Sequence, residues 1–308
     1  MTVTLTTAAQ DYLRVRRTLG YKLDGADETL RRFIAHVDLL DPPTVTIGAC
    51  LDWVMTQGRD GRGVGAAGRL TVIRCFARYL HALDPAHQVP PTRLIAQNTS
   101  RPTPRLFNET EISALMTAAR QLNPVRWADT VEVVIGVLWV TGMRVGEVLR
   151  LNVGDINFDT GEATVLLAKF GKTRLVPLDP TTIAVLQAYR KRVRVTTAAA
   201  PMFIGRDRQR LEYSRFKAAF NQLTETIGLT GTGGRRPRLH DVRHSFAVRT
   251  VLGWYQTGQD VHALLPRLST YMGHVEPAST YWYLSAAPEL MAILAARIDR
   301  DEPTVVAS

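Results

Sequence analysis

The chain has 308 residues, of which 45% are hydrophobic and 21% are charged, a balance that excludes a disordered protein and allows one large domain or two of ordinary size. Its 38 lysines and arginines outnumber its 28 aspartates and glutamates, so the formal net charge of +10 favours a polyanionic partner such as nucleic acid. The two cysteines, Cys50 and Cys75, provide neither metal-ligand spacing nor a disulfide framework, which fits a reducing compartment.

The first part of the chain, residues 5–83, is expected to consist mainly of amphipathic helices, because apolar residues recur there at helical spacing. The pattern predicts a short helix over 47–56 and another helix over 70–83. Arginines crowd this region. Arg69 and Arg74 are candidates for contacts with DNA phosphates, and the alternative is that they lie on a solvated helix face.

Targeting and membrane signals are not expected in this sequence. Residues 1–10 are rich in threonine and lack an apolar core, so they do not predict a signal peptide. The most apolar segment, 133–143, is much shorter than the ~20 residues that a membrane-spanning helix needs. We therefore expect a cytoplasmic protein without membrane contact.

Prolines gather between residues 85 and 106, where large apolar residues are few. A proline-rich spacer is extended and semi-rigid, which predicts a linker between two domains. Such a linker would let the domains hold opposite sides of a duplex.

The remaining residues, 107–308, are expected to form a mainly helical domain with a small antiparallel sheet. Asn108 and Glu111 have the spacing of a capping box, which predicts a helix start. A nearly all-apolar run over 131–141 predicts a fully buried helix, whereas strand-like runs and turn residues over 155–178 predict hairpins. Further helices are expected at 181–195, 213–227 and 288–298.

Residues capable of chemistry concentrate between 238 and 284. His240 and Arg243 are three positions apart in a helix-compatible context, so they share one helix face. A second histidine, His274, and a tyrosine, Tyr283, follow. A permanent cation, two groups that pass protons and an oxygen nucleophile suit a reaction at a phosphodiester.

Two other segments would supply further cations to such a site. Arg144 stands at a predicted helix start within Thr141-Gly142-Met143-Arg144. Lys169 and Lys172 flank the predicted tip of a hairpin.

These segments resemble, in residues and in order, the motifs of the phage integrase family of tyrosine recombinases. The matching segments lie across 107–290 and are 141–149, 169–178, 240–244, Gly273-His274 and Tyr283. The resemblance implies a helical core-binding domain in 1–84, a linker in 85–106 and an α+β catalytic domain in 107–308. It also implies site-specific recombination through a 3′-phosphotyrosyl intermediate, with neither a metal ion nor a cofactor.

By this resemblance, Arg144 and Arg243 bind the non-bridging oxygens of the scissile phosphate, where negative charge accumulates in the transition state. His240 then acts as the acid or base that helps the tyrosine lose its proton. His274 donates a hydrogen bond to the phosphate.

The resemblance also favours one of two candidate residues for each of two catalytic roles. Tyr283 is favoured as the nucleophile over Tyr281, because of its spacing from His274 and the match of the segment that follows it. Lys169 is favoured as the donor of a proton to the leaving 5′-oxygen, and Lys172 is then a turn residue that touches DNA.

Two features do not fit this pattern directly. His240 and His244 have the spacing of a zinc site, but no Glu follows His240 and no cysteine cluster is present, so we expect no metal. Between Arg243 and His274 the chain is longer than in typical family members by about two helical turns, around residues 255–266.

The implied partners are double-stranded DNA and further copies of this chain. Family members form a homo-tetramer on paired sites, for which the amphipathic helix expected over 288–298 would be the exchanged segment. An accessory recombinase or DNA-bending protein is a further partner. Two rival functions remain open at this point, namely a type IB topoisomerase and a catalytically silent DNA-binding regulator on the same fold.

Overall fold

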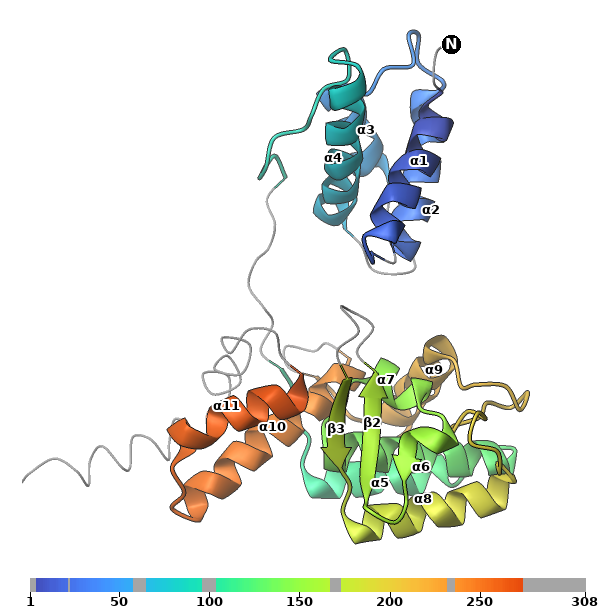
Figure 1. The fold of residues 1–308 in the computed structure, drawn as a ribbon, viewed down its shortest axis with the longest axis vertical. Coiled ribbons are helices and arrows are strands. Elements are labelled where there is room, and N and C mark those ends of the chain that lie inside the picture. The colour runs from blue at the N-terminus through green and yellow to red at the C-terminus, as the bar shows by residue number, and fades with distance from the viewer. Residues whose placement is uncertain are drawn as a thin grey trace, which may run out of the picture. The chain divides into compact units, whose positions relative to one another are not determined.

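The computed structural model describes residues 4–21, 23–57, 65–95, 104–166, 173–231 and 236–273. The chain divides into two compact units between Arg101 and Pro102 (Figure 1). Within the described residues, every helix is too short or too polar to cross a lipid bilayer.

The described part of the N-terminal unit is helical. Its helices are α1 (Leu5–Thr18), α2 (Asp24–Val37), α3 (Ile47–Thr56) and α4 (Ala66–Leu83). Threonine side chains cap two of them, because Thr4 accepts a hydrogen bond from the Thr7 N–H and Thr46 accepts one from the Ala49 N–H. The core of this unit forms where apolar helix faces meet, as in the edge-to-face contact of Phe33 and Trp53 at 5.5 Å.

The second unit is a helical domain with a three-stranded antiparallel sheet, as the sequence predicts. Its helices are α5 (Glu109–Ala119), α6 (Val125–Thr141), α7 (Val145–Arg150), α8 (Pro180–Val193), α9 (Tyr213–Thr226), α10 (Leu239–Gln256) and α11 (Val261–Met272). The strands β1 (Ile156–Asn157), β2 (Glu162–Leu166) and β3 (Thr173–Pro177) lie in that order, with Thr164 opposite Leu175. The fold class expected from the sequence is therefore confirmed.

Local sequence explains where the central helices begin and end. The predicted capping box opens α5, because Asn108 accepts from the Glu111 N–H at 2.9 Å and Glu111 accepts from the Asn108 N–H at 3.1 Å. The apolar run over 131–141 forms the last eleven residues of α6, and most of its side chains are buried. Val140 is 44% exposed, so this helix is not fully buried as the sequence predicts. Gly142 ends α6 with a φ of +59°, and a Cβ there would lie 2.2 Å from the Phe246 ring. Only glycine fits this turn.

Helices α10 and α11 form a hairpin with its own small core. The two helices pack side by side and extend away from the sheet (Figure 1). Val251, Leu265 and Leu268 are buried between them. The additional residues around 255–266 therefore build the outer end of this hairpin, while its inner end stays in contact with α6 and β3.

Candidate active site

Arg144 follows the Gly142 turn and lies at the start of α7. Its side chain is 40% exposed and makes two hydrogen bonds. The Nη1 group donates to Oε1 of Glu147 at 2.9 Å, and Nη2 donates to the carbonyl oxygen of Gly273 at 2.9 Å. The guanidinium is thus fixed in orientation while part of it faces solvent.

Arg243 lies in the first turns of α10 and is only 2% exposed. Its Nη1 donates to the carbonyl oxygen of Gly142 at 2.7 Å, and its Nη2 donates to the carbonyl oxygen of Met272 at 2.6 Å. Met272 and Gly273 are neighbours in the chain. The end of α11 therefore brings together the guanidinium groups of Arg144 and Arg243, whose positions are 99 residues apart in sequence (243 minus 144).

His240 precedes Arg243 on α10 and is exposed. Partial desolvation of its ring, followed by the positive charge of Arg243, lowers the pKa of His240 from 6.5 to about 4. Arg238 and Arg144 act in the same direction, whereas Asp241 opposes them. A neutral imidazole at physiological pH is able to accept a proton, which is the role expected of a base.

His244 lies one turn further along α10 and is buried. Its ring meets the His240 ring edge-on, with 4.5 Å between the ring centroids. No group of three His, Cys, Asp or Glu residues in the described part of the chain is placed to hold a metal ion.

Glu147 and Arg174 complete this cluster, and the sequence did not identify Arg174 as a functional residue. Glu147 is 4% exposed and accepts hydrogen bonds from both Arg144 and Arg174. Burial on its own would raise the pKa of Glu147. Hydrogen bonds from the Arg174 side chain and the Arg144 N–H, the positive charge of Arg174 and the hydrogen bond from the Arg144 side chain together outweigh burial and lower this pKa to about 2. Glu147 is therefore ionised between two arginines.

Several residues predicted from the sequence lie outside the described residues, namely Lys169, Lys172, His274, Tyr281 and Tyr283. Their neighbours in the chain belong to the site. Thr173 begins β3 directly after Lys172, and Gly273, which precedes His274, accepts the hydrogen bond from Arg144.

The two arginines proposed for DNA contact in the N-terminal unit are engaged with main-chain oxygens. Arg69 is 3% exposed and donates to the carbonyl oxygens of Val54 at 3.1 Å and Gln57 at 2.7 Å. It stabilises the end of α3, and this burial counts against the predicted phosphate contact. Arg74 is half-buried and donates to the carbonyl oxygens of two prolines, Pro90 and Pro91, so it ties the proline-rich segment to α4.

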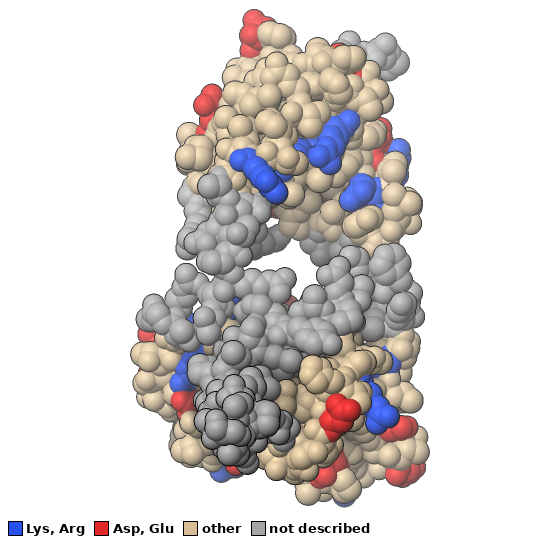
Figure 2. Space-filling model, turned by 90° about the vertical axis from the view of Figure 1, so that its left-hand side faces the viewer, with Lys and Arg blue, Asp and Glu red and all other residues tan. Residues whose placement is uncertain are grey.

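The net charge does not by itself locate a DNA-binding surface. On the face drawn in Figure 2, the Lys and Arg side chains of the described residues lie in separate places, and on the second unit some of them lie beside Asp or Glu side chains. The clustered cations of the second unit are instead the partly buried arginines around Glu147.

The fold and these gathered residues define a tyrosine recombinase, an enzyme that cuts and rejoins DNA strands through a tyrosine side chain. The model of the phage integrase family matches residues 105–289. The chain belongs to the phage integrase family, as the resemblance of its motifs predicts.

Comparisons with individual proteins agree with this assignment. The chain is 39% identical over 304 residues to the putative integrase/recombinase y4rB of Sinorhizobium fredii, covering 95% of this chain and 96% of that protein. It is 27% identical over 231 residues to the tyrosine recombinase XerC of Pelotomaculum thermopropionicum, covering 72% of this chain and 71% of that protein. A lambda integrase tetramer bound to a Holliday junction has the same fold, with a TM-score of 0.64 at 15% identity over 92% of this chain and 77% of that chain.

Proposed function

We propose that this chain binds double-stranded DNA and exchanges strands between specific sites through a 3′-phosphotyrosyl intermediate formed on Tyr283. One observation carries the proposal. Arg144 and Arg243 donate to the adjacent carbonyl oxygens of Gly273 and Met272, so two permanent cations meet at one point in the fold, directly before His274.

The two guanidinium groups suit the transition state of phosphoryl transfer. Negative charge accumulates on the non-bridging oxygens while the tyrosine oxygen attacks phosphorus. The carbonyl contacts of Arg144 and Arg243 fix the plane of each guanidinium before DNA binds. Donors that are already oriented need little reorganisation when charge develops, so they favour the transition state over the ground state.

Proton transfers accompany both halves of the reaction. A tyrosine hydroxyl has an ordinary pKa of about 10, so we propose that Tyr283 transfers its proton to His240 as the new P–O bond forms. The bond from phosphorus to the 5′-oxygen breaks, and Lys169 protonates that oxygen. A 5′-hydroxyl of the partner strand then attacks the phosphotyrosine and gives its proton to Lys169, while His240 returns a proton to the departing oxygen of Tyr283. His274 donates a hydrogen bond to the phosphate throughout, and Lys172 contacts the DNA backbone.

Residues 1–84 would form a DNA-binding domain, with 85–106 as the linker to the catalytic domain, 107–308. Arg74 stays a candidate for DNA contact at its exposed portion. Rejoining needs no nucleotide, because the phosphotyrosyl ester conserves the energy of the phosphodiester. Arg144 and Arg243 supply the positive charge at the phosphate, so the proposed reaction uses no metal ion. A DNA substrate supports the cytoplasmic location expected from the sequence.

Recombination between two sites needs four copies of the chain, which we propose are joined through the segment 288–298. Four copies are seen for lambda integrase on a Holliday junction. The segment lies outside the described residues, and its sequence carries Leu290, Met291, Ile293 and Leu294. An apolar helix face of this kind needs an apolar acceptor on the neighbouring copy.

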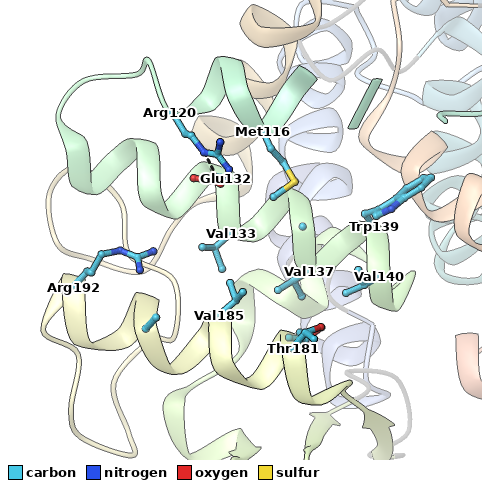
Figure 3. Close-up of a pocket in the computed structure, with 13 residues that line it drawn as sticks. Met116, Arg120, Glu132, Val133, Val137, Trp139, Val140, Thr181, Val185 and Arg192 are labelled. Atoms are coloured by element: carbon cyan, nitrogen blue, oxygen red, sulfur yellow. Dashed lines mark hydrogen bonds and ion pairs between the residues drawn. The ribbon is translucent and has the colours of Figure 1, made fainter. Parts of the chain in front are cut away.

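A cavity of about 440 Å³ between α5, α6 and α8 is the acceptor that we favour (Figure 3). Its floor is apolar, with Val133, Val137 and Val140 from α6 facing Val185 from α8. Val140 and Val185 are 44% and 50% exposed, which is high for branched apolar side chains that face a hollow. None of the catalytic candidates lines this cavity.

Replacing Val185 with Glu is expected to reduce the yield of four-subunit complexes on DNA at least tenfold, about 1.4 kcal/mol, because an unpaired carboxylate is costly to bury in an apolar groove. Native gels or light scattering with bound DNA measure the assembly. The side chain is half exposed in the single chain, so folding and cleavage of isolated sites should be retained.

The matched control for this prediction is Val125→Glu, at a valine that is 75% exposed and does not line the cavity. If both variants assemble as well as the unsubstituted protein, the acceptor lies elsewhere on the catalytic domain.

The proposed function is tested with a plasmid that carries two copies of a DNA site selected by the protein from a random-sequence pool. Strand exchange is expected to yield deleted or inverted plasmid without added metal or nucleotide. Relaxation of supercoils without exchange would instead show a topoisomerase, and binding without covalent adducts would show a regulator. Either of those two outcomes would overturn the proposal.

A further inference from the structure

Arg174 is the residue on β3 that connects three separate parts of the catalytic cluster. Its side chain is only 10% exposed. Nη1 and Nη2 donate to the two carboxylate oxygens of Glu147, at 3.2 and 2.8 Å, and Nε donates to the carbonyl oxygen of Tyr271 at 2.8 Å. A single guanidinium therefore joins β3, α7 and the end of α11.

The carboxylate of Glu147 is shared between two arginines. Its Oε1 accepts from Arg144 and from Arg174, while Oε2 accepts from the Arg144 N–H and from Arg174. Two guanidinium groups with one carboxylate leave one net positive charge. Because Arg174 offsets most of the charge of Glu147, the positive charge of Arg144 remains available to an approaching phosphate.

The end of α11 fits closely over these arginines. Gly273 has a φ of +67°, and a Cβ there would lie 3.0 Å from Nη1 of Arg174 and 3.5 Å from Nη1 of Arg144. The close approach lets the Gly273 carbonyl accept from Arg144 while the Tyr271 carbonyl accepts from Arg174. These two hydrogen bonds therefore couple the position of the end of α11 to the orientation of Arg144.

We propose that Arg174 is a positioning residue for strand cleavage, which acts through Glu147 and the end of α11 to hold the guanidinium of Arg144 toward the scissile phosphate. The proposal rests on the proposed function of this site. Arg174 also lies on the strand that begins at Thr173, four positions after Lys169 in the sequence.

Lysine cannot replace Arg174 in this role. The three hydrogen bonds of Arg174 use both arms and the Nε of one planar fork, and they reach acceptors on two different elements. An ammonium group retains the charge but not the fork. The variants Arg174→Lys and Arg174→Gln thus separate charge from geometry.

The test measures single-turnover formation of the covalent adduct on a nicked suicide duplex, together with DNA affinity and Tm. Arg174→Gln is expected to slow cleavage on the order of 10- to 100-fold. In metal sites of other proteins, removing a group that only orients a ligand has an effect of this size. DNA affinity should change less than about threefold, a small free-energy difference. Arg174→Lys should recover part of the rate at most.

A double-mutant cycle distinguishes positioning from simple stabilisation. If Arg174 acts through Arg144, adding Arg174→Gln to an Arg144→Ala variant should slow cleavage less than about threefold further, because residues that act as a unit are not additive. The pH profile gives a second readout. Without Arg174 the pKa of Glu147 rises, so the acidic limb of the profile should move to higher pH.

Arg210 is the matched control, because it is another arginine that binds α7, but through main-chain oxygens of α7 and its flank. It donates to the carbonyl oxygens of Leu149 and Leu151 and does not contact Glu147. Arg210→Gln should lower Tm, and any effect of it on cleavage should be the same in the presence and absence of Arg144.

The outcomes separate this proposal from the function on which it rests. If Arg174→Gln slows cleavage equally with and without Arg144, or lowers only Tm, the positioning role is wrong while the enzyme is still a recombinase. If the unsubstituted protein forms no adduct on its selected site, the proposed function itself fails.

Discussion

Replacing Tyr283 with Phe is expected to eliminate the covalent protein–DNA adduct entirely. The substitution removes only the hydroxyl oxygen, which is the atom that would bond to phosphorus, so no slower route through the same residue exists. The measurement is a denaturing gel of protein incubated with a nicked suicide duplex. DNA binding should be nearly unchanged, because the substitution keeps the aromatic ring.

Tyr281→Phe is the control for this prediction, since Tyr281 lies two positions earlier in the same segment. It should form adducts at close to the normal rate. The reverse pattern, with adducts from Tyr283→Phe and none from Tyr281→Phe, would assign the nucleophile to Tyr281. Adducts from both single variants would exclude both tyrosines as the sole nucleophile.

Arg144→Ala is expected to slow adduct formation by about 10²- to 10³-fold or more, the usual effect of removing one donor that faces developing charge. Stability should change little, because the side chain is 40% exposed and Glu147 keeps its two bonds from Arg174. Single-turnover cleavage and thermal unfolding measure the two effects separately.

Arg243→Ala is the informative comparison, because Arg243 is buried. It should lose cleavage to a similar degree and also lose stability. The carbonyl groups of Gly142 and Met272 would each lose a donor, at a cost of about 1–3 kcal/mol for each buried group. If Arg144→Ala proved the less stable of the two, or cleaved DNA normally, the roles assigned here would be wrong.

The sequence predicted much of the catalytic domain because its signals are local. The capping box of Asn108 and Glu111 and the apolar run over 131–141 mark helices that form as expected, α5 and α6. The alternation over 155–178 marks the sheet. His240 and Arg243 share a helix because their spacing is short. The family resemblance rested on these same short segments.

The contacts that organise the site are not local, so the sequence alone did not reveal them. Glu147 and Arg174 are 27 positions apart, and Arg243 reaches the Gly142 carbonyl across 101 positions. Arg174 was visible only as one member of a matching segment. The environment of Arg69 was hidden for a related reason, since a basic residue within a basic run gives no sign that its guanidinium will be buried against carbonyl oxygens. Its contact with DNA stays a prediction.

The end of α11 has one further consequence for how the enzyme is controlled. A helix terminates with carbonyl oxygens that its own N–H groups cannot reach, and the partial negative charge there attracts cations. In this fold Arg174, Arg243 and Arg144 cap the oxygens of Tyr271, Met272 and Gly273 in turn. The arginines proposed to bind or position the scissile phosphate are therefore also the cap of a helix. Unwinding the last turn of α11 would remove the acceptors that orient these arginines and would slow cleavage, although every reactive group would still be present. Anything that stabilises that turn would have the opposite effect.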